Sequence, residues 1–268
     1  PLRPGTDAAF LMACIHVILK EFHVKKKTPY FIDYTKQYTN LPFLVVLDKQ
    51  KDGDYLSGRF LRASDIKEFA GEENAEWKMP MFDAAGKLRL PGGSVGFRWE
   101  KKKQGRWNMK NEDVTTGKPF DPLLTCLDGK NQAVQVKFAD FTDTYNTELG
   151  TTEGTGKPSK GMSRGVPSRT VTTVDGKKVR VTTAYDLLLA QYGIDRGLGG
   201  DYPKNYNDAS KPYTPAWQEQ ETGVDRALAI RVAREWADTA KKTKGKCLFI
   251  TGSGILHWYH GGTLIYRA

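Results

Sequence analysis

Apolar residues recur at helical spacing close to the start of the chain. From Asp7 to Phe22 they fill nearly every side of the expected helix, with Leu11 and Ile15 on one face and Cys14 on another. A helix of this kind is typically buried in a larger body, whereas a surface helix keeps one polar face. His16 interrupts the run, and we interpret it as a hydrogen-bonded core histidine, because no residue near it in sequence pairs with it as ligand or base.

Capping residues predict further helices. Thr and Asp accept hydrogen bonds at a helix start, Pro is favoured in the first turn, and Gly favours the end. We expect helices over 28–38, 183–191, 214–222 and 225–239, and a short one over 63–70. The last long helix is expected to pack through four apolar residues with two alanines beside them: Val224, Leu228, Val232, Trp236, Ala233 and Ala237. Its arginines, Arg226, Arg231 and Arg234, are expected to face solvent.

Short apolar runs between turn residues predict strands. They cover 41–47, 55–61, 77–81, 87–90, 95–99, 133–138, 169–174, 177–182 and 247–250. Asp175-Gly176 predicts a two-residue hairpin turn between two of them. The stretch 148–169 is rich in Gly, Ser, Thr and Pro and is expected to be an exposed loop. Because the run 247–250 follows a helix and precedes a Gly-rich turn, the end of the chain predicts a parallel α/β sheet.

Charge and cysteine usage narrow the function classes. The 268 residues include 41 Lys and Arg against 31 Asp and Glu, a net charge of +10. The basic residues are scattered or lie in short runs, Lys25–Lys27 and Lys101–Lys103, which favours solvated faces and anion attraction over nucleic-acid binding. Cys14, Cys126 and Cys247 are too far apart in sequence to form a local metal motif. No run of about 18 apolar residues suggests a membrane span, and no signal peptide is visible.

Two glycine-containing turns are candidate seats for an anionic ligand. Pro4-Gly5 leads into Thr6 and Asp7 at a helix start, where unpaired N–H groups and the helix dipole attract phosphate. An ordinary capped turn explains the same residues. At the other end, Gly252-Ser253-Gly254 follows the predicted strand 247–250. The stretch 154–158 is not a phosphate-binding P-loop, because that motif requires Gly at 151 and Ser or Thr at 158.

Four motifs, in this order, resemble one known family. They are Arg3-Pro4-Gly5-Thr6-Asp7-Ala8-Ala9, Tyr213-Thr214-Pro215-Ala216-Trp217, Thr222-Gly223-Val224, and Gly252-Ser253-Gly254 followed by His257-Trp258-Tyr259-His260. Together they are similar to the catalytic alpha subunit of respiratory nitrate reductase and, equally, to nitrite oxidoreductase. Both are molybdopterin guanine dinucleotide oxidoreductases. The resemblance covers nearly the whole chain and is weakest over 78–170.

The resemblance implies an α/β class, as part of a molybdopterin oxidoreductase fold: a parallel sheet with inserted β-hairpins and long loops. Segment 1–75 would be an α/β cofactor-binding segment, and 76–170 an inserted β/loop region that could contact partner subunits. Segment 171–268 would be α/β and end in the Gly-rich cofactor loop. Because Pro1 lies inside a motif, we expect an internal fragment that is inactive alone.

The implied cofactor is molybdenum bound by two molybdopterin guanine dinucleotides. By resemblance one grip on it would use Arg3, Gly5, Thr6 and Asp7, and a second grip would use Gly252, Ser253 and Gly254. Glycine permits close backbone approach, Arg pairs with phosphate, and carboxylate or hydroxyl oxygens accept guanine N–H groups. In the family the Asp that binds molybdenum and the ligands of a [4Fe–4S] cluster lie upstream, so we assign no metal ligand in this chain.

His257 and His260 are the candidate catalytic residues. Either imidazole could bind the oxygens of nitrate or nitrite and move protons, and the alternative is packing against the pterin or a neighbouring domain. The expected reaction is the interconversion of nitrite and nitrate by oxygen-atom transfer, with a preference for nitrite oxidation.

By resemblance, electrons would pass through iron–sulfur centres to a beta subunit, with a haem-bearing gamma subunit as a further partner and no nucleic acid. A membrane-associated location is implied, on a side that the sequence does not fix. Two alternatives stay open: a related enzyme acting on selenate, chlorate or a hydrocarbon, and a basic, non-enzymatic module that binds nucleic acid or other anions.

Overall fold

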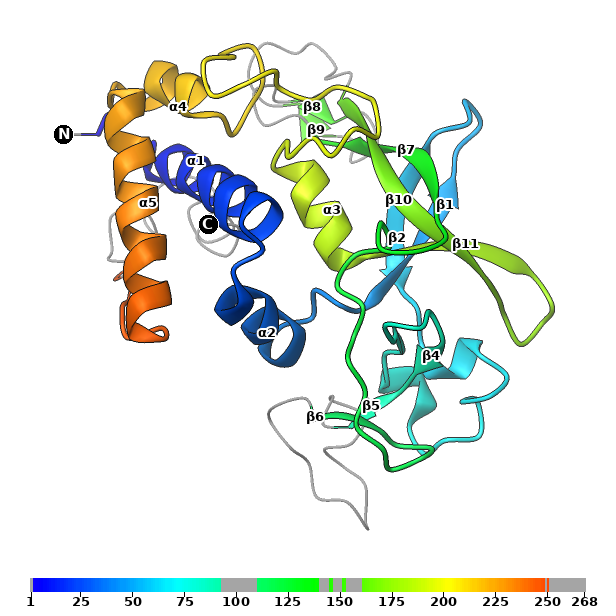
Figure 1. Ribbon diagram of the computed structural model, residues 1–268. Helices are drawn as coiled ribbons and strands as arrows, with labels where there is room; N and C mark the ends of the chain where they lie inside the picture. Colours follow the sequence, from blue (N-terminus) through cyan, green and yellow to red (C-terminus); the bar gives the residue numbers. More distant parts are fainter. Residues whose placement is uncertain are drawn as a thin grey trace. The chain divides into compact units, whose positions relative to one another are not determined.

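The computed structural model describes residues 2–92, 110–139, 145–146, 151–152, 161–248 and 250. The chain forms two compact units that interleave in sequence. The first, here called the helical unit, comprises Pro1–Phe31, Ala139–Met162 and Leu189–Ala268. The second, the barrel unit, comprises Ile32–Phe138 and Ser163–Leu188. Figure 1 shows the helices and strands of both.

A five-stranded closed barrel forms the centre of the barrel unit. The strand order is β1 (Leu44–Lys49), β11 (Lys178–Thr183), β10 (Met162–Thr172), β7 (Gln132–Phe138) and β2 (Tyr55–Phe60). β1 pairs antiparallel with β2 and β11, β10 pairs antiparallel with β11, and β2 pairs parallel with β7. The parallel sheet expected from the sequence is therefore wrong for the described strands. Short turns join β1 to β2 and β10 to β11, and a short turn can only connect antiparallel neighbours.

Apolar residues from the barrel strands and from the segments beside them share one core. The buried members are Leu44, Leu61, Ala63, Ile66, Phe69, Ala75, Phe82, Leu90, Leu123, Cys126, Val171 and Val181. Around it lie two small antiparallel sheets, β3 (Met81–Phe82) with β4 (Leu88–Arg89) and β5 (Pro91–Gly92) with β6 (Lys110–Asp113). The hairpin predicted over 77–90 is confirmed, although its strands are shorter.

Two predictions for this unit are wrong. The helix expected over 63–70 is only a 3₁₀ turn, η2 (Ala63–Asp65), with a second, η3 (Ala75–Trp77), further on. The Asp65 carboxylate accepts from the Arg62 backbone N–H at 2.8 Å and caps the start of this turn, but Ile66 is extended (φ −113°, ψ 122°), so the helix ends there. The expected loop 148–169 contains the first part of β10, where Arg164, Val166 and Ser168 are fully buried. Its composition is misleading because polar side chains there bond inside the barrel, as Ser168 Oγ does to the Gln132 carbonyl at 2.7 Å.

Three long helical segments build the helical unit. α1 (Asp7–Ile18) continues directly into a π-helical segment, η1 (Leu19–Lys25), and both α4 (Pro215–Thr222) and α5 (Arg226–Thr243) pack against α1. The chain also pairs β8 (Tyr145–Asn146) with β9 (Thr151–Thr152). Two further helices, α2 (Pro29–Tyr38) and α3 (Ala184–Gln191), cross from one unit to the other along the chain. All five predicted long helices are present, and η1 and α5 extend beyond the ends expected for the first and the last.

The packing face of α5 differs from the prediction. Its buried residues are Ala229, Ala233 and Ala237, whereas Leu228 is 44% exposed. Ala233 packs with Cys14 and Val17 of α1. Small side chains allow two helix backbones to approach closely, so the alanine stripe faces α1, and of the predicted larger residues Val232 packs partly buried beside it.

The buried strand expected over 247–250 is also not observed among its described residues. Positions 246–248 and 250 form no strand, and Leu248 and Ile250 are 75% and 82% exposed. A strand requires a neighbour for its backbone hydrogen bonds, and no described residue pairs with this segment. Apolar composition alone does not supply that neighbour.

Candidate functional site

The turn that opens the chain is formed by local hydrogen bonds. Gly5 has a φ of +79°, a conformation that favours glycine. The Thr6 hydroxyl donates to the Arg3 carbonyl at 2.7 Å, and the Thr6 carbonyl accepts from the N–H groups of Ala9 and Phe10. Thr6 is therefore the N-cap residue by position, but its side chain does not cap the helix as expected. It closes the turn that precedes the helix.

Arg3 links this turn to the C-terminal end of α4. Its backbone N–H donates to the Thr222 carbonyl at 3.0 Å, and its Nη1 donates to the carbonyls of Gln220 and Glu221 at 2.5 and 3.4 Å. These are carbonyls of the last helical turn, which carry the negative end of the helix dipole, so a guanidinium is well placed there. Arg3 thus has a structural partner that its sequence neighbours do not reveal, while Nε and Nη2 make no hydrogen bond among the described residues.

The start of α1 keeps hydrogen-bonding capacity on the side of the turn. The N–H groups of Asp7 and Ala8 have no acceptor among the described residues, and the Asp7 carboxylate has no donor or ion-pair partner there. Two backbone donors at the positive end of a helix dipole attract an anion. A carboxylate beside them can accept N–H groups of a polar ligand. Gly5, with its positive φ, and Asp7, at the helix start, therefore both lie in this turn, and their role in binding a ligand stays a prediction.

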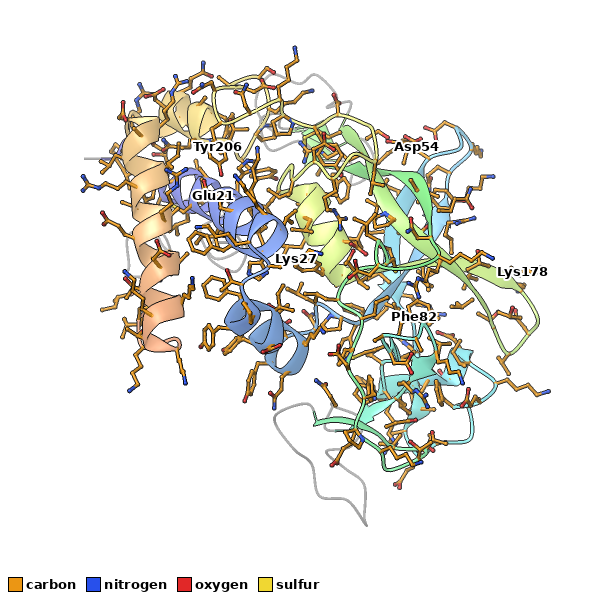
Figure 2. The ribbon with its side chains drawn as sticks, viewed as in Figure 1. Glu21, Lys27, Asp54, Phe82, Lys178 and Tyr206 are labelled. Carbon is orange, nitrogen blue, oxygen red and sulfur yellow. The ribbon has the colours of Figure 1, made fainter. Side chains whose placement is uncertain are left out.

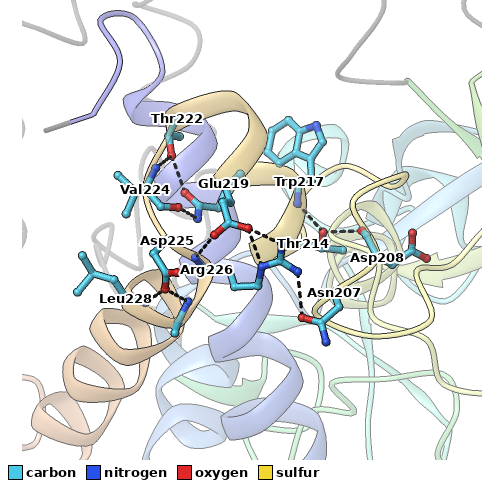
Figure 3. A network of polar contacts seen from close by, with 12 residues as sticks. Asn207, Asp208, Thr214, Trp217, Glu219, Thr222, Val224, Asp225, Arg226 and Leu228 are labelled. Carbon is cyan, nitrogen blue, oxygen red and sulfur yellow. Dashed lines mark hydrogen bonds and ion pairs between the residues drawn. The ribbon is translucent and has the colours of Figure 1, made fainter.

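A polar network holds α4 in place (Figure 3). Arg226 Nε and Nη2 bind the Glu219 carboxylate at 2.6 and 2.5 Å, and Arg226 Nη1 reaches Asn207 Oδ1 at 3.1 Å. The Thr214 hydroxyl accepts from the Trp217 N–H at 3.1 Å and so caps the start of α4 as predicted. Arg226 is therefore a link between α4 and α5 that the sequence did not predict, although its side chain remains 39% exposed.

A second polar group between helices was not predicted. Glu21 of η1 accepts hydrogen bonds from Arg234 of α5 and from the Tyr206 hydroxyl, the latter at 3.0 Å (Figure 2). Burial raises the pKa of Glu21, but the bonds from Arg234 and Tyr206 outweigh it and leave that pKa below its ordinary value. Burial and the neighbouring carboxylate raise the pKa of Tyr206. The signal that could have indicated this pair is the one glutamate of the long first helical run, α1 with η1.

The interior of α1 supports a structural role for its other polar residues. His16 is fully buried, and its Nδ1 lies 2.6 Å from the Tyr192 carbonyl, which confirms the core histidine. Burial raises the pKa of the Cys14 thiol to about 12, so this thiol is unreactive at neutral pH. Cys14 and Cys126 are both buried free thiols.

The second predicted grip and both candidate catalytic residues lie outside the described residues: Gly252, Ser253, Gly254, His257 and His260. Within the part that is described, no three His, Cys, Asp or Glu side chains gather in a way that could hold a metal ion. No described helix is both long and apolar enough to cross a membrane.

Comparison with known proteins places the chain in a class. No family model matches it. It is 42% identical over 259 residues to the respiratory nitrate reductase 2 alpha chain of Escherichia coli, which covers 96% of this chain and 20% of that protein. It is 38% identical over 268 residues to the nitrate reductase alpha chain of Bacillus subtilis, covering 100% of this chain and 20% of the relative. The match to a formate dehydrogenase alpha subunit of Nitratidesulfovibrio vulgaris is weaker, 28% over 200 residues, 74% of this chain and 16% of that subunit.

Identity along nearly all its length therefore places the chain in one family. It is a homologue of the nitrate reductase alpha chains. It spans about a fifth of the length of the relatives that it matches. The family resemblance drawn from its ordered motifs is confirmed.

Proposed function

We propose that the chain is part of the catalytic subunit of a molybdenum oxidoreductase that interconverts nitrite and nitrate by oxygen-atom transfer. The observation that carries this proposal is the identity of about 40% to nitrate reductase alpha chains over nearly the whole chain. Since the chain matches only a fifth of those proteins, the activity belongs to the larger assembly. We expect the chain alone to be inactive.

The implied cofactor, molybdenum-bis(molybdopterin guanine dinucleotide), would supply the metal centre that exchanges an oxygen atom and an electron pair with the substrate. The opening turn fits a phosphate or guanine group of such a molecule. Gly5 allows close backbone approach, the N–H groups of Asp7 and Ala8 can donate, and the Asp7 carboxylate can accept. Arg3 keeps Nε and Nη2 for an anion while Nη1 holds α4, and Thr6 keeps the turn closed.

The remaining assignments rest on the resemblance. Gly252, Ser253 and Gly254 would form the second grip, and His257 or His260 would bind substrate oxygens and hold or move protons. The region 76–170 is proposed as an insertion that contacts partner subunits. Electrons would reach or leave the site through a [4Fe–4S] cluster elsewhere in the subunit, an iron–sulfur beta subunit and a haem-bearing gamma subunit, in a membrane-associated complex.

Nitrite oxidation is the direction that we favour. The formate dehydrogenase relative supports a wider class of candidate enzymes, and a relative acting on selenate, chlorate or a hydrocarbon is therefore the second candidate. Oxidation and reduction assays with nitrite, nitrate, selenate and chlorate, using redox dyes on the intact native complex, separate these candidates.

The first test is the cofactor content of the intact native protein. We expect about one molybdenum and two acid-released guanosine monophosphates per subunit, as a bis-dinucleotide cofactor requires. Asp7→Asn removes one acceptor without changing shape and should lower the retained guanosine monophosphate. Asp201→Asn is the matched control, since Asp201 forms an ion pair with Lys211 in the same unit. Well-folded intact protein without molybdenum or guanosine would contradict the proposal.

A further inference from the structure

Two lysine runs that are far apart in sequence lie close together in the helical unit. The first, Lys25–Lys27, ends η1 and forms the turn before α2, and the second runs from Lys241 to Lys246 at the end of α5. Gly245 has a φ of +81°, and its backbone approaches the Tyr30 hydroxyl so closely that a Cβ on Gly245 would overlap it. Because Tyr30 is only three residues after Lys27, the two runs flank this contact. Figure 1 shows the end of α5 beside the start of α2.

Together the runs make an exposed group that we call the lysine patch. Its members are Lys25, Lys26, Lys27, Lys241, Lys242, Lys244 and Lys246, and all seven are exposed. The sequence shows only short separate runs, so this concentration of charge comes from the fold.

The lysine patch keeps most of its charge unpaired within the described protein. None of its seven ammonium groups forms an ion pair with a described carboxylate. Lys26 has two other interactions: its Nζ lies 3.9 Å from the centre of the Phe22 ring, and its charge helps to lower the pKa of Glu21. Asp238, on the preceding turn of α5, makes no ion pair with any member.

Arginines on the same helix behave differently. Arg226 pairs with Glu219, Arg231 with Glu235 and Arg234 with Glu21. The arginine part of α5 therefore satisfies its charges internally, while its lysine end presents charge outward. Lysines at a helix C-terminus gain from the helix dipole, but this explains neither the run Lys25–Lys27 nor its position beside that end.

Of the surfaces that could accept this charge, an anionic lipid surface fits best. Arginine is preferred for fixed, bidentate binding of carboxylate and phosphate, and lysine is depleted in protein interfaces. Seven hydrated, flexible ammonium groups without an arginine suit mobile, closely spaced headgroups instead. Clusters of four to eight basic residues are typical of binding to anionic lipid headgroups.

We propose that the lysine patch docks the protein on a membrane surface rich in anionic lipid. The patch is separate from the opening turn and from the proposed redox chemistry, so it can be tested whether or not that chemistry is correct. Binding at this surface is electrostatic and reversible, and it requires no membrane-spanning segment.

The test is sedimentation of the intact native protein with vesicles of phosphatidylcholine alone or with one third phosphatidylglycerol. We expect binding only to the anionic vesicles, and its loss near 1 M salt, where the Debye length falls to about 3 Å. A lysine near an anionic surface contributes a factor of roughly five in affinity. Replacing Lys25, Lys241, Lys242 and Lys246 by Gln should therefore weaken binding by at least about tenfold.

The matched control replaces four exposed lysines of the barrel unit by Gln: Lys49, Lys67, Lys130 and Lys178. It removes the same net charge and should leave vesicle binding within about twofold, because none of these four lysines belongs to the lysine patch. Equal losses in both variants would show attraction by net charge only and overturn the proposal. Failure of the native protein to bind anionic vesicles would overturn it as well, and binding of poly-glutamate through the patch would then indicate an acidic protein partner.

Discussion

Glu21 in the helical unit and Asp186 in the barrel unit are held by different hydrogen-bond donors, although two other carboxylates of the barrel unit, Asp83 and Asp113, also bind a guanidinium, that of Arg89. In the helical unit Glu21 meets an opposite charge, the Arg234 guanidinium, with Nη2 2.6 Å from its Oε1. In the barrel unit Asp186 is fully buried and accepts from neutral donors: the hydroxyls of Thr125 and Thr183 at 2.5 and 2.8 Å and the Cys126 N–H at 2.7 Å.

The difference follows from how each unit is connected. Two helices that pack side by side can bring long side chains together at the edge of their contact, where water still screens them. The Asp186 carboxylate instead joins the start of α3 to the segment around Thr125, about 60 positions away in sequence. Asp186 is therefore a buried link between two segments that are distant in sequence.

Asp186→Ala should have the largest effect. It leaves a buried backbone N–H and two hydroxyls without their acceptor, and each such group costs about 1–3 kcal/mol. We expect the opening free energy of β10 and β11, measured by hydrogen exchange of their amides, to fall by about 3 kcal/mol or more. Asp121→Asn is the control, because the Asp121 side chain is 65% exposed in its ion pair with Lys36. If the opening free energy fell equally little in both variants, Asp186 would not be an important buried link in the barrel unit.

The local features of both units could be predicted from the sequence. Thr214 and Asp225 cap α4 and α5 as expected, because a side-chain oxygen two or three residues before a backbone N–H reaches it without help from the rest of the fold. The β10–β11 hairpin follows from its turn residues in the same way.

The long-range features could not be predicted. Closure of the barrel depends on β7 meeting β2 and β10, and no residue within β7 specifies those neighbours. Arg3 illustrates the same limit in the candidate site, since its acceptors on α4 are 217 and 218 positions away. The sequence motifs identified Arg3 as a candidate binding residue. Only the fold shows that its side chain also donates hydrogen bonds to carbonyl groups of α4.

Ala233→Leu tests the close approach of α5 to α1 in the helical unit. Ala233 is fully buried against Cys14 and Val17, so the added carbons must displace a helix, at about 2 kcal/mol. Chemical denaturation and hydrogen exchange of α1 amides should both report this loss. Leu228→Ala, at a residue that is 44% exposed, should change stability far less. A larger loss of stability for Leu228→Ala than for Ala233→Leu would mean that α5 packs through the row of larger residues predicted from the sequence.

Glu21→Gln tests the ion pair of the helical unit through pH. The folded-state pKa of Glu21 lies below its unfolded value, so its contribution is present above the unfolded value near 4.5 and is lost as pH falls through the folded pKa. The variant should lose about 1 kcal/mol at pH 7 and converge with the native protein at acidic pH. Melting curves of both proteins between pH 7 and 3 measure this. Glu235→Gln, which breaks an exposed pair with Arg231, should follow the native pH profile, and parallel profiles for all three proteins would contradict the assignment.

Gly176→Ala should have the smallest effect, because its cause is local. The Thr173 carbonyl accepts from the Gly176 N–H at 2.9 Å, and Gly176 has a φ of +78°. The hairpin loop is therefore a turn followed by a glycine bulge. The two-residue turn expected from Asp175-Gly176 is not formed. Nothing lies within 4 Å of a Cβ placed there, so only backbone strain of about 1 kcal/mol opposes the substitution.

Gly58→Ala is the informative contrast within the same barrel, since its Cβ would lie 2.9 Å from the Val46 carbonyl oxygen between β1 and β2. Hydrogen exchange of β1 and β11 amides should show a clearly larger loss for Gly58→Ala. Equal losses of protection in the two variants would mean that a substitution between paired strands destabilises the barrel no more than one in a turn.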